Sequence, residues 1–451
     1  MHVRPLRLSS AHLLLRWAEA VYLVAALLAL TLGPVYTVRL RMAPLEADFT
    51  ADLATQTVFV VIYGVAAVLL ARTAVRWWRL RRPLLAVGGL CALLVFSTTW
   101  SVRPTDTFAT GLLTTATALF GVYLALRWSP LAIAGGLYVS SLIGVGSSLW
   151  AIQRNWPGAK DNNADWAGVY LNRNSLGPVA TMGVLSGLFV VASLGLVTRQ
   201  ASATIRRRLM FGTVLTAVPI YPCYRVLRHT RSFTGVAGAL AALIVAALLV
   251  LLLAAGRRWP MLRRLAPVIL AGVAAIGAVA VDVGRDRLAT SVDKLPTLSG
   301  RTIIWRVVRH WFHLRPSKGW GWMAIWRYPP FRADLDSTGY HVFSAHSGYL
   351  EVALAAGWLG VVVLAVALVV VIAGVLIWSA QRADLAGVWC TALLTYCLVV
   401  NTSETYIGAN LLPWALLVSV GVGAAHNPND SGLLNEGSTS AIAPNARSGG
   451  G

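Results

Sequence analysis

Apolar runs of membrane length alternate with polar connections along most of the chain. A helix of about 20 apolar residues spans the hydrocarbon core of a bilayer, and the pattern predicts about twelve such helices. We expect them near residues 14–36, 55–72, 83–101, 108–127, 130–152, 175–198, 209–226, 233–255, 265–283, 348–379, 386–402 and 407–425. Pro219 and Pro222 predict a break in the seventh helix, and the tenth is long enough to be tilted. The pattern therefore indicates an all-α polytopic membrane protein.

One polar interruption, residues 284–345, is far longer than the few residues that usually join two helices. It is rich in Arg, Trp and His, and we expect short helices within it. The chain then divides into residues 1–174 with helices one to five and an outer loop, 175–283 with helices six to nine, 284–347 as an external catalytic loop, 348–425 with helices ten to twelve, and 426–451 as a tail. The tail is rich in Asn, Ser, Gly and Pro, which predicts disorder.

Charge is scarce and unevenly placed. Of the 451 residues, 57% are hydrophobic and 12% are charged, about half the charged fraction of a soluble domain. The net charge of +21 does not indicate a nucleic-acid partner, because the arginines gather between apolar runs. They cluster at alternate connections: Arg4 and Arg7; Arg72, Arg76, Arg79, Arg81 and Arg82; Arg199, Arg206, Arg207 and Arg208; Arg257, Arg258, Arg263 and Arg264.

Basic connections of this kind are cytoplasmic in membrane proteins. This rule predicts that both termini are cytoplasmic and that the long loop faces outward. The first apolar run lacks an A-x-A-like cleavage site, so we expect a retained helix and not a signal peptide.

The long loop carries many basic residues on the side that the same rule leaves poor in charge. They are Arg285, Arg287, Lys294, Arg301, Arg306, Arg309, Arg315, Lys318, Arg327 and Arg332. Long loops cross the membrane regardless of charge, which is one explanation. The explanation that we favour is an electropositive cleft that holds a phosphate head group at the membrane surface.

Among the eight histidines, His346 lies at the junction between the long loop and the tenth helix. A lipid-linked head group would meet water at this depth, and histidine titrates near neutral pH. We therefore expect His346 to act as a general base. The cysteines, Cys91, Cys223, Cys390 and Cys397, lie in or at the ends of apolar runs and are expected to be packing residues. No H-E-x-x-H or similar ligand pair predicts a metal site, and no cofactor is expected.

Several motifs occur in a fixed order. His346-Ser347 is followed after nine residues by Gly357-Trp358-Leu359-Gly360. Further motifs are Leu171-Asn172-Arg173-Asn174-Ser175-Leu176-Gly177, Thr230-Arg231-Ser232, Gly300-Arg301-Thr302-Ile303-Ile304-Trp305, Lys318-Gly319-Trp320-Gly321 and Asn401-Thr402-Ser403-Glu404-Thr405. Together they resemble the bacterial O-antigen ligase and polymerase family, with Thr230 where the family usually has Ser. The resemblance extends from about Asn172 to Trp414, and the first five helices agree only in hydropathy.

The resemblance implies a GT-C-like fold and a metal-independent, inverting glycosyl transfer at the outer side of a bacterial cytoplasmic membrane. The donor would be a glycan linked to undecaprenyl pyrophosphate, and the acceptor a hydroxyl of a lipid or cell-wall glycan. His346 would be the general base, while Arg301 and Arg231 would bind the pyrophosphate and stabilise its charge as it departs.

Other residues are candidates for substrate binding. Arg173 is a candidate because it precedes a helix at the outer side. Arg225 and Arg228 are candidates because they lie close to Arg231 in the sequence. Glu351 is expected to orient the base or pair with an arginine, and Glu404 to bind the acceptor or an arginine. Five tryptophans are candidates for a sugar-stacking or interfacial surface: Trp305, Trp311, Trp320, Trp322 and Trp326.

Four alternatives stay open. The acceptor of a related polymerase would be another carrier-linked repeat unit, and that of a protein O-oligosaccharyltransferase a serine or threonine. A transferase using a polyprenyl monophosphate sugar would employ Glu46, Asp48 or Asp52 as base, which leaves His346 without a role. A flippase for lipid-linked glycans would show paired, interrupted helices and charges at mid-membrane. The spacing of the two glycines after His346 favours a ligase.

Overall fold

The structure is a computed structural model, and it describes residues 10–33, 53–73, 80–161, 164–170, 172–270, 272, 296–409 and 411–426. Within these ranges the chain forms helices and no β-strand, and an isolated β-bridge joins Lys160 to Trp166. Seven helical segments are long and apolar enough to cross a membrane. The chain is therefore an all-helical membrane protein, and the number of twelve membrane helices stays a prediction.

The first half of the fold contains α1 (Ser10–Ala29), α3 (Leu53–Ala71), α4 (Arg81–Phe96), the short 3-10 helix η3 (Ser97–Trp100), α5 (Pro104–Arg127), α6 (Pro130–Gln153), α7 (Arg173–Gln200), α8 (Ala203–Ala217) and α9 (Ile220–Thr230). The second half contains α10 (Phe233–Gly256), α12 (Pro296–Leu314), the 3-10 helix η4 (Ala324–Arg327), α13 (Pro329–Asp336), α14 (Gly348–Arg382), α15 (Leu385–Val400) and α16 (Leu412–Ala425).

Eleven of the twelve predicted spans overlap helices, and most of their ends lie within five residues of a helix end. The exception is the ninth, of which only residues 265–270 and 272 are described. The seventh span is broken as Pro219 and Pro222 predicted, into α8 and α9. The predicted tail after residue 426, and the residues Arg4, Arg7, Arg76, Arg79, Arg285, Arg287, Lys294, Glu46, Asp48 and Asp52, lie outside the described residues.

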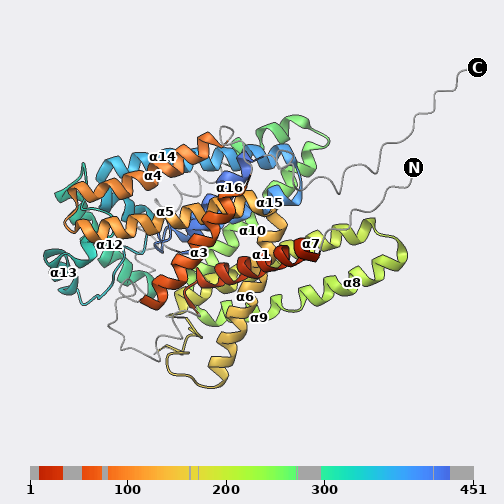
Figure 1. The fold of residues 1–451 in the computed structure, drawn as a ribbon, viewed down its shortest axis with the longest axis horizontal. Coiled ribbons are helices and arrows are strands. Elements are labelled where there is room, and N and C mark those ends of the chain that lie inside the picture. Colours follow the sequence, from red (N-terminus) through yellow and green to blue (C-terminus); the bar gives the residue numbers. More distant parts are fainter. Residues whose placement is uncertain are drawn as a thin grey trace, which may run out of the picture.

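The helices run mainly along the long axis of the molecule (Figure 1). The long loop contributes α12 and α13, which lie together at the left-hand end of that view, while the connection between α7 and α8 lies at the right-hand end. We call these the α12 end and the α8 end. Trp311, Trp320 and Trp326 pack into a separate small core with Phe331 and Leu335, so the loop is a folded unit.

The long helix α14 is interrupted at Gly357, whose backbone (φ 62°, ψ −151°) only glycine adopts readily. The interruption frees two carbonyl groups of α14 for the turn after α12. The N–H of Trp320 donates to Leu354 O (3.0 Å), and the N–H of Gly321 donates to Ala355 O (2.9 Å). In return, the N–H of Trp358 donates to Pro316 O (2.7 Å). The interruption at Gly357 therefore anchors the folded loop onto the membrane helices.

Side-chain caps define where several helices begin at the α12 end. Asn172 caps α7 by accepting from Ser175 N (3.0 Å), Ser232 caps α10 by accepting from Gly235 N (3.3 Å), and Ser347 caps α14 by accepting from Leu350 N (3.5 Å). Such caps satisfy N–H groups that have no partner inside the helix. Each cap is next in sequence to a residue predicted to carry chemistry: Arg173, Arg231 and His346 respectively.

Candidate active site

Three side chains from distant parts of the chain form a connected row at the α12 end. Nδ1 of His346 lies 3.2 Å from Oε2 of Glu404, and the other carboxylate oxygen of Glu404 accepts from Nη2 of Arg301. Arg301 and Glu404 are nearly buried, with side chains 7% and 12% exposed, whereas that of His346 is 30% exposed. The row therefore leads from a buried arginine to a histidine that reaches solvent.

The contact with Glu404 favours one tautomer of the imidazole. A carboxylate paired with an arginine only accepts hydrogen bonds, so Nδ1 of His346 is the donor in this contact. In the tautomer that carries its proton on Nδ1, the lone pair of Nε2 is free. The arrangement leaves the nitrogen farther from Glu404 able to take a proton from a substrate.

The backbone of His346 is itself unusual. Its φ of 46° lies in the left-handed region, which costs a residue other than glycine about 1–3 kcal/mol and is concentrated at functional sites. Arg231 shows the same feature with φ of 47°. Both residues immediately precede the cap of a helix, at the point where the chain turns sharply into α14 or α10.

Glu351 supports the backbone that carries His346. Its carboxylate accepts from the indole N–H of Trp326, from the N–H of Ala345 (2.8 Å) and from the hydroxyl of Thr405 (3.4 Å). The residue is 2% exposed. These bonds engage both oxygens, so Glu351 holds the end of the loop in place without contacting an arginine.

The turn that contains Glu404 is tied to the start of α14. The N–H of Gly348 donates to the carbonyl oxygens of Asn401 and Glu404, both at 3.0 Å, and the N–H of Ser347 donates to Thr405 Oγ1 (3.2 Å). The turn itself is closed by Asn401, whose side-chain oxygen accepts from Ile407 N (2.6 Å). His346 and Glu404 are thus held on one rigid support.

A second charged cluster surrounds Asp165, in the connection between α6 and α7. Asp165 Oδ2 accepts from Nη1 of Arg173, and Oδ1 lies 3.4 Å from Nε of Arg231. The carboxylate side chain is 3% exposed and that of Arg173 18%, whereas the side chain of Arg231 is 73% exposed. The cluster presents Arg231 to solvent and keeps the other two charges largely covered.

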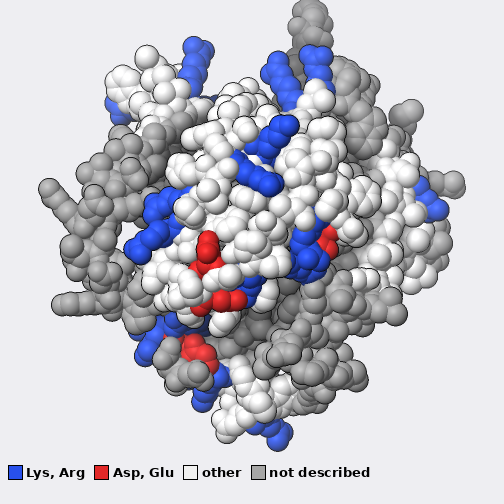
Figure 2. Space-filling model, turned by 90° about the vertical axis from the view of Figure 1, so that its left-hand side faces the viewer, with Lys and Arg blue, Asp and Glu red and all other residues white. Residues whose placement is uncertain are grey.

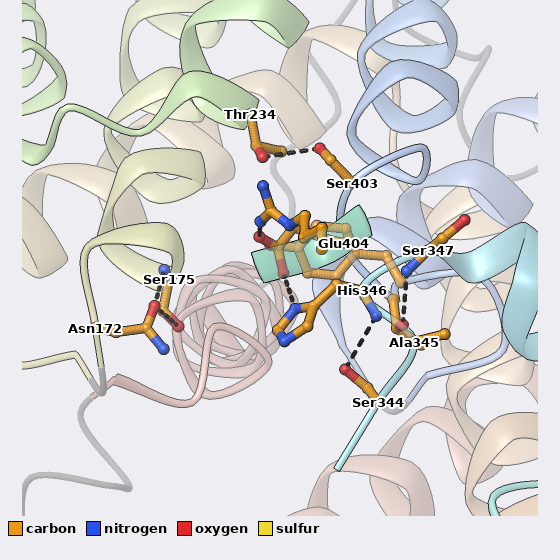
Figure 3. A network of polar contacts seen from close by, with 12 residues as sticks. Asn172, Ser175, Thr234, Ser344, Ala345, His346, Ser347, Ser403 and Glu404 are labelled. Carbon is orange, nitrogen blue, oxygen red and sulfur yellow. Dashed lines mark hydrogen bonds and ion pairs between the residues drawn. The ribbon is translucent and has the colours of Figure 1, made fainter. Parts of the chain in front are cut away.

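The two clusters adjoin each other. Thr234, three residues after Arg231, shares a hydrogen bond of 2.8 Å with Ser403, the neighbour of Glu404. A side-chain atom added at Gly177 of α7 would lie 2.5 Å from the Ser232 side chain, so α7 and the start of α10 are in close contact. In Figure 3 the imidazole of His346 projects from Glu404 toward the side on which Asn172 and Ser175 of α7 lie. The starts of α7, α10 and α14 therefore meet at this site.

Basic side chains are plentiful around this face. Figure 2 shows the α12 end with Lys and Arg side chains around a smaller group of Asp and Glu side chains. Arg225 and Arg228 are exposed on α9, and no ion pair is formed by either within the part of the chain that the structure describes. The exposed arginines and the three helix N-termini together make this face favourable for an anion.

Four of the five tryptophans do not form the sugar-stacking surface considered from the sequence, because they are buried. Trp311, Trp320, Trp322 and Trp326 are 6%, 5%, 1% and 2% exposed. They pack inside the folded loop or against the membrane helices, because their large apolar rings supply most of the core available there. Trp305 is half-buried and donates from its indole to Ala345 O (2.8 Å), so it lies beside His346.

Asp165 is the residue of this site that sequence patterns did not reveal. It lies seven residues before Asn172, in the connection between two predicted membrane helices, where an acidic side chain is ordinarily solvated. The sequence signal is a short acidic segment just before an arginine motif. It does not show how close Asp165 lies to Arg173 or Arg231. The four cysteines are buried with free thiols, as expected for packing residues. No group of three His, Cys, Asp or Glu side chains suited to a metal ion occurs in the described ranges.

Comparison with known proteins gives one family. The model of the O-antigen ligase family matches residues 232–365, which run from the cap of α10 through α12, α13 and His346 into α14. Curated proteins include no match to the chain. The matched segment holds Arg301, His346 and both glycines of the His346 motif. This match and the helical membrane fold of the described residues support an assignment to the O-antigen ligase family of membrane glycan enzymes.

Proposed function

We propose that the chain transfers a glycan from undecaprenyl pyrophosphate to an acceptor hydroxyl, at the outer side of a bacterial cytoplasmic membrane. The contact of His346 with Glu404, which is in turn paired with Arg301, carries this proposal. It joins a base and a cationic group in one site. A reaction that removes a proton from an alcohol and releases a pyrophosphate requires both.

His346 is the general base in this proposal. Nε2 accepts the proton of the acceptor hydroxyl as that oxygen forms a bond to the anomeric carbon, and the bond from this carbon to the pyrophosphate oxygen breaks. Attack from the face opposite the leaving group inverts the anomeric centre. General-base assistance contributes about 10²- to 10⁴-fold in rate. Glu404 keeps the ring in the required tautomer and stabilises the imidazolium that forms.

Arginines stabilise the negative charge that develops on the leaving pyrophosphate. The exposed side chain of Arg231 makes the direct contact, and the buried Arg301 adds positive charge from behind Glu404. Arg173, Arg225 and Arg228 extend the positive surface along α7 and α9. A guanidinium group can donate two parallel hydrogen bonds to the oxygens of one phosphate, and it keeps its positive charge in proteins. Arginines can therefore supply the charge that a divalent cation supplies in other pyrophosphate-releasing enzymes.

The distribution of arginines supports this side of the membrane. Arg199 lies in the last turn of α7 and Arg257 follows α10, so both lie at the opposite ends of these helices from the caps Asn172 and Ser232. If those arginines are cytoplasmic, as the positive-inside rule expects, His346 faces outward in this proposal. The glycan acceptor is a lipid or cell-wall component in this proposal. Transfer to a carrier-linked repeat unit would instead identify a polymerase, and transfer to a protein hydroxyl a protein O-oligosaccharyltransferase.

A transfer assay in detergent with purified undecaprenyl pyrophosphate glycan, candidate acceptors and EDTA tests the proposal. Wild-type protein is expected to release undecaprenyl pyrophosphate in the presence of EDTA and to label one class of acceptor. His346→Ala is expected to bind the donor without releasing it. Donor binding with no turnover for any acceptor would instead support a flippase, and near-normal turnover by His346→Ala would remove the general-base role.

A further inference from the structure

Asp165 is a buried carboxylate between two arginines that come from different helices. It accepts from Nη1 of Arg173 at the start of α7 and lies 3.4 Å from Nε of Arg231 at the end of α9. Its own side chain is 3% exposed. A carboxylate at this depth is stable only when it is paired and hydrogen-bonded, so the two arginines and Asp165 form one unit.

The backbone around Asp165 is held from two sides. The N–H of Asp165 donates to Oδ1 of Asp161 (2.9 Å), and the N–H of Asp161 donates to the carbonyl oxygen of Asp165 (2.9 Å). On the other side, Trp166 N–H donates to His229 O (3.1 Å), and the two rings stack with centroids 4.1 Å apart and planes at 15°. The carboxylate therefore has a fixed position relative to the end of α9.

The two arginines of this unit differ in accessibility. Arg173 is 18% exposed and Arg231 is 73% exposed in their side chains. Arg173 also lies 4.0 Å from Asp161 Oδ2, so its charge is offset by two carboxylates, and the positive charge that solvent reaches is mainly that of Arg231. An arginine side chain loses rotamer entropy when it binds a ligand, and a preformed contact through Nε reduces this loss.

We propose that Asp165 is a positioning residue that holds Arg231 ready for the diphosphate group of the lipid-linked donor. The proposal rests on the proposed function, because it assigns Asp165 to donor recognition and not to the chemical step. It assigns His346 and Glu404 to the step itself. Loss of the Asp165 charge should then weaken donor binding through Arg231 and leave acceptor recognition unchanged.

The experiment measures the dissociation constant of the undecaprenyl pyrophosphate glycan in full-length protein that carries His346→Ala, so that binding is read without turnover. Addition of Asp165→Asn is expected to weaken donor binding about tenfold, because Arg231 then lacks the charged partner that holds its side chain in place. The matched control is Asp106→Asn. Asp106 also lies between two arginines, 2.5 Å from Arg103 and 3.5 Å from Arg327, but it contacts neither Arg231 nor His346. This control is expected to bind the donor like the parent.

A double-variant cycle shows whether the effect passes through Arg231. In protein that already carries Arg231→Gln, Asp165→Asn is expected to cause no further loss of donor affinity. His229→Ala provides a second route, because it removes the ring that stacks on Trp166 but keeps the charge of Asp165. It is expected to weaken donor binding by a smaller factor, again with no effect when Arg231→Gln is present.

Unchanged donor affinity in both Asp165→Asn and His229→Ala would overturn the proposal, as would losses that simply add to that of Arg231→Gln. If Asp165→Asn does not fold, the His229→Ala comparison decides alone. Failure of the proposed function is a separate result. Wild-type protein would then bind the donor and release no undecaprenyl pyrophosphate, and the affinities of these variants would still show whether Asp165 acts through Arg231.

Discussion

Nδ1 of His346 and Oε2 of Glu404 are 3.2 Å apart although 58 residues separate them in the chain. The contact joins the end of the folded loop to the turn between α15 and α16, and Arg301 of α12 completes it from the other side of the carboxylate. A base, its orienting carboxylate and a cation therefore come from three segments. This relationship leads to the first of four predictions.

Glu404→Gln is expected to lower the rate constant of transfer by about 10- to 100-fold with little change in donor binding. An amide can present its N–H₂ group to His346 and thereby favour the tautomer in which Nε2 carries the proton. Rate constants and donor affinities would be compared with those of Glu19→Gln. Glu19 also pairs with an arginine, Arg127, at 2.7 Å, but it lies on α1 at the other end of the bundle. A normal rate in Glu404→Gln would contradict the orienting role.

Arg301→Lys and Arg231→Lys are expected to differ. Both should impair transfer, because an ammonium group does not reproduce the planar guanidinium fork. The buried Arg301 pair with Glu404 would be disrupted, so this variant should also lower the midpoint of thermal unfolding and the rate constant of the chemical step. Because Arg231 is exposed, Arg231→Lys should mainly raise the KM for the donor. Steady-state kinetics and thermal unfolding of the two variants test the distinction, and identical behaviour would argue against it.

Glu351→Gln is expected to destabilise the protein by about 1–3 kcal/mol, the usual effect of leaving a buried polar group without a partner. The carboxylate now accepts hydrogen bonds from Trp326, Ala345 and Thr405, and an amide nitrogen would face one of these donors. Transfer should fall as well, because Ala345 precedes His346. Trp326→Phe removes one donor while keeping an aromatic ring, and it should have a smaller effect on both measurements. An equal or larger effect of Trp326→Phe would show that ring packing, and not the carboxylate, supports the loop.

Gly357→Ala is expected to lower the free energy of unfolding by at least about 1–3 kcal/mol, because its backbone conformation is strained for any other residue. The added methyl group would also lie 2.4 Å from the carbonyl oxygen of Pro316. Gly374→Ala is the matched control in the same helix, since no atom lies within 4 Å of the added group. That control should be neutral or stabilising by about 0.5–1 kcal/mol. Denaturant unfolding in detergent compares the two, and equal stabilities would contradict the role of the interruption.

The positions of the helices follow from local properties of the chain. Hydropathy marked the membrane helices to within a few residues, and Pro219 with Pro222 marked the break between α8 and α9. The polar loop 284–347 was expected to contain short helices, and α12, η4 and α13 occur in its described part, from residue 296 onward. These features depend on solvent transfer and backbone geometry over one or two turns, which a single sequence displays directly.

The environment of each candidate side chain depends on contacts between distant segments. The tryptophans of the loop were candidates for a sugar-binding surface, yet four of them are core residues. The presence of tryptophans in a loop cannot by itself distinguish a binding surface from a core, because an indole ring suits both. Glu351 was expected to orient the base or to pair with an arginine, and the structure adds that it holds the backbone next to His346 through Trp326 and Ala345.

Hydrophobic length, prolines and motif spacing are local properties, so the class of protein, most of the helices and the motifs can be recognised without a structure. The pairing of charges cannot, and it became visible in the fold: Glu404 pairs with Arg301 and His346, and Asp165 with Arg173 and Arg231. The tertiary structure also decided that Arg301 is buried and Arg231 exposed. Electrostatic interactions depend on distance and burial, and both are set by the packing of helices that are far apart in the chain.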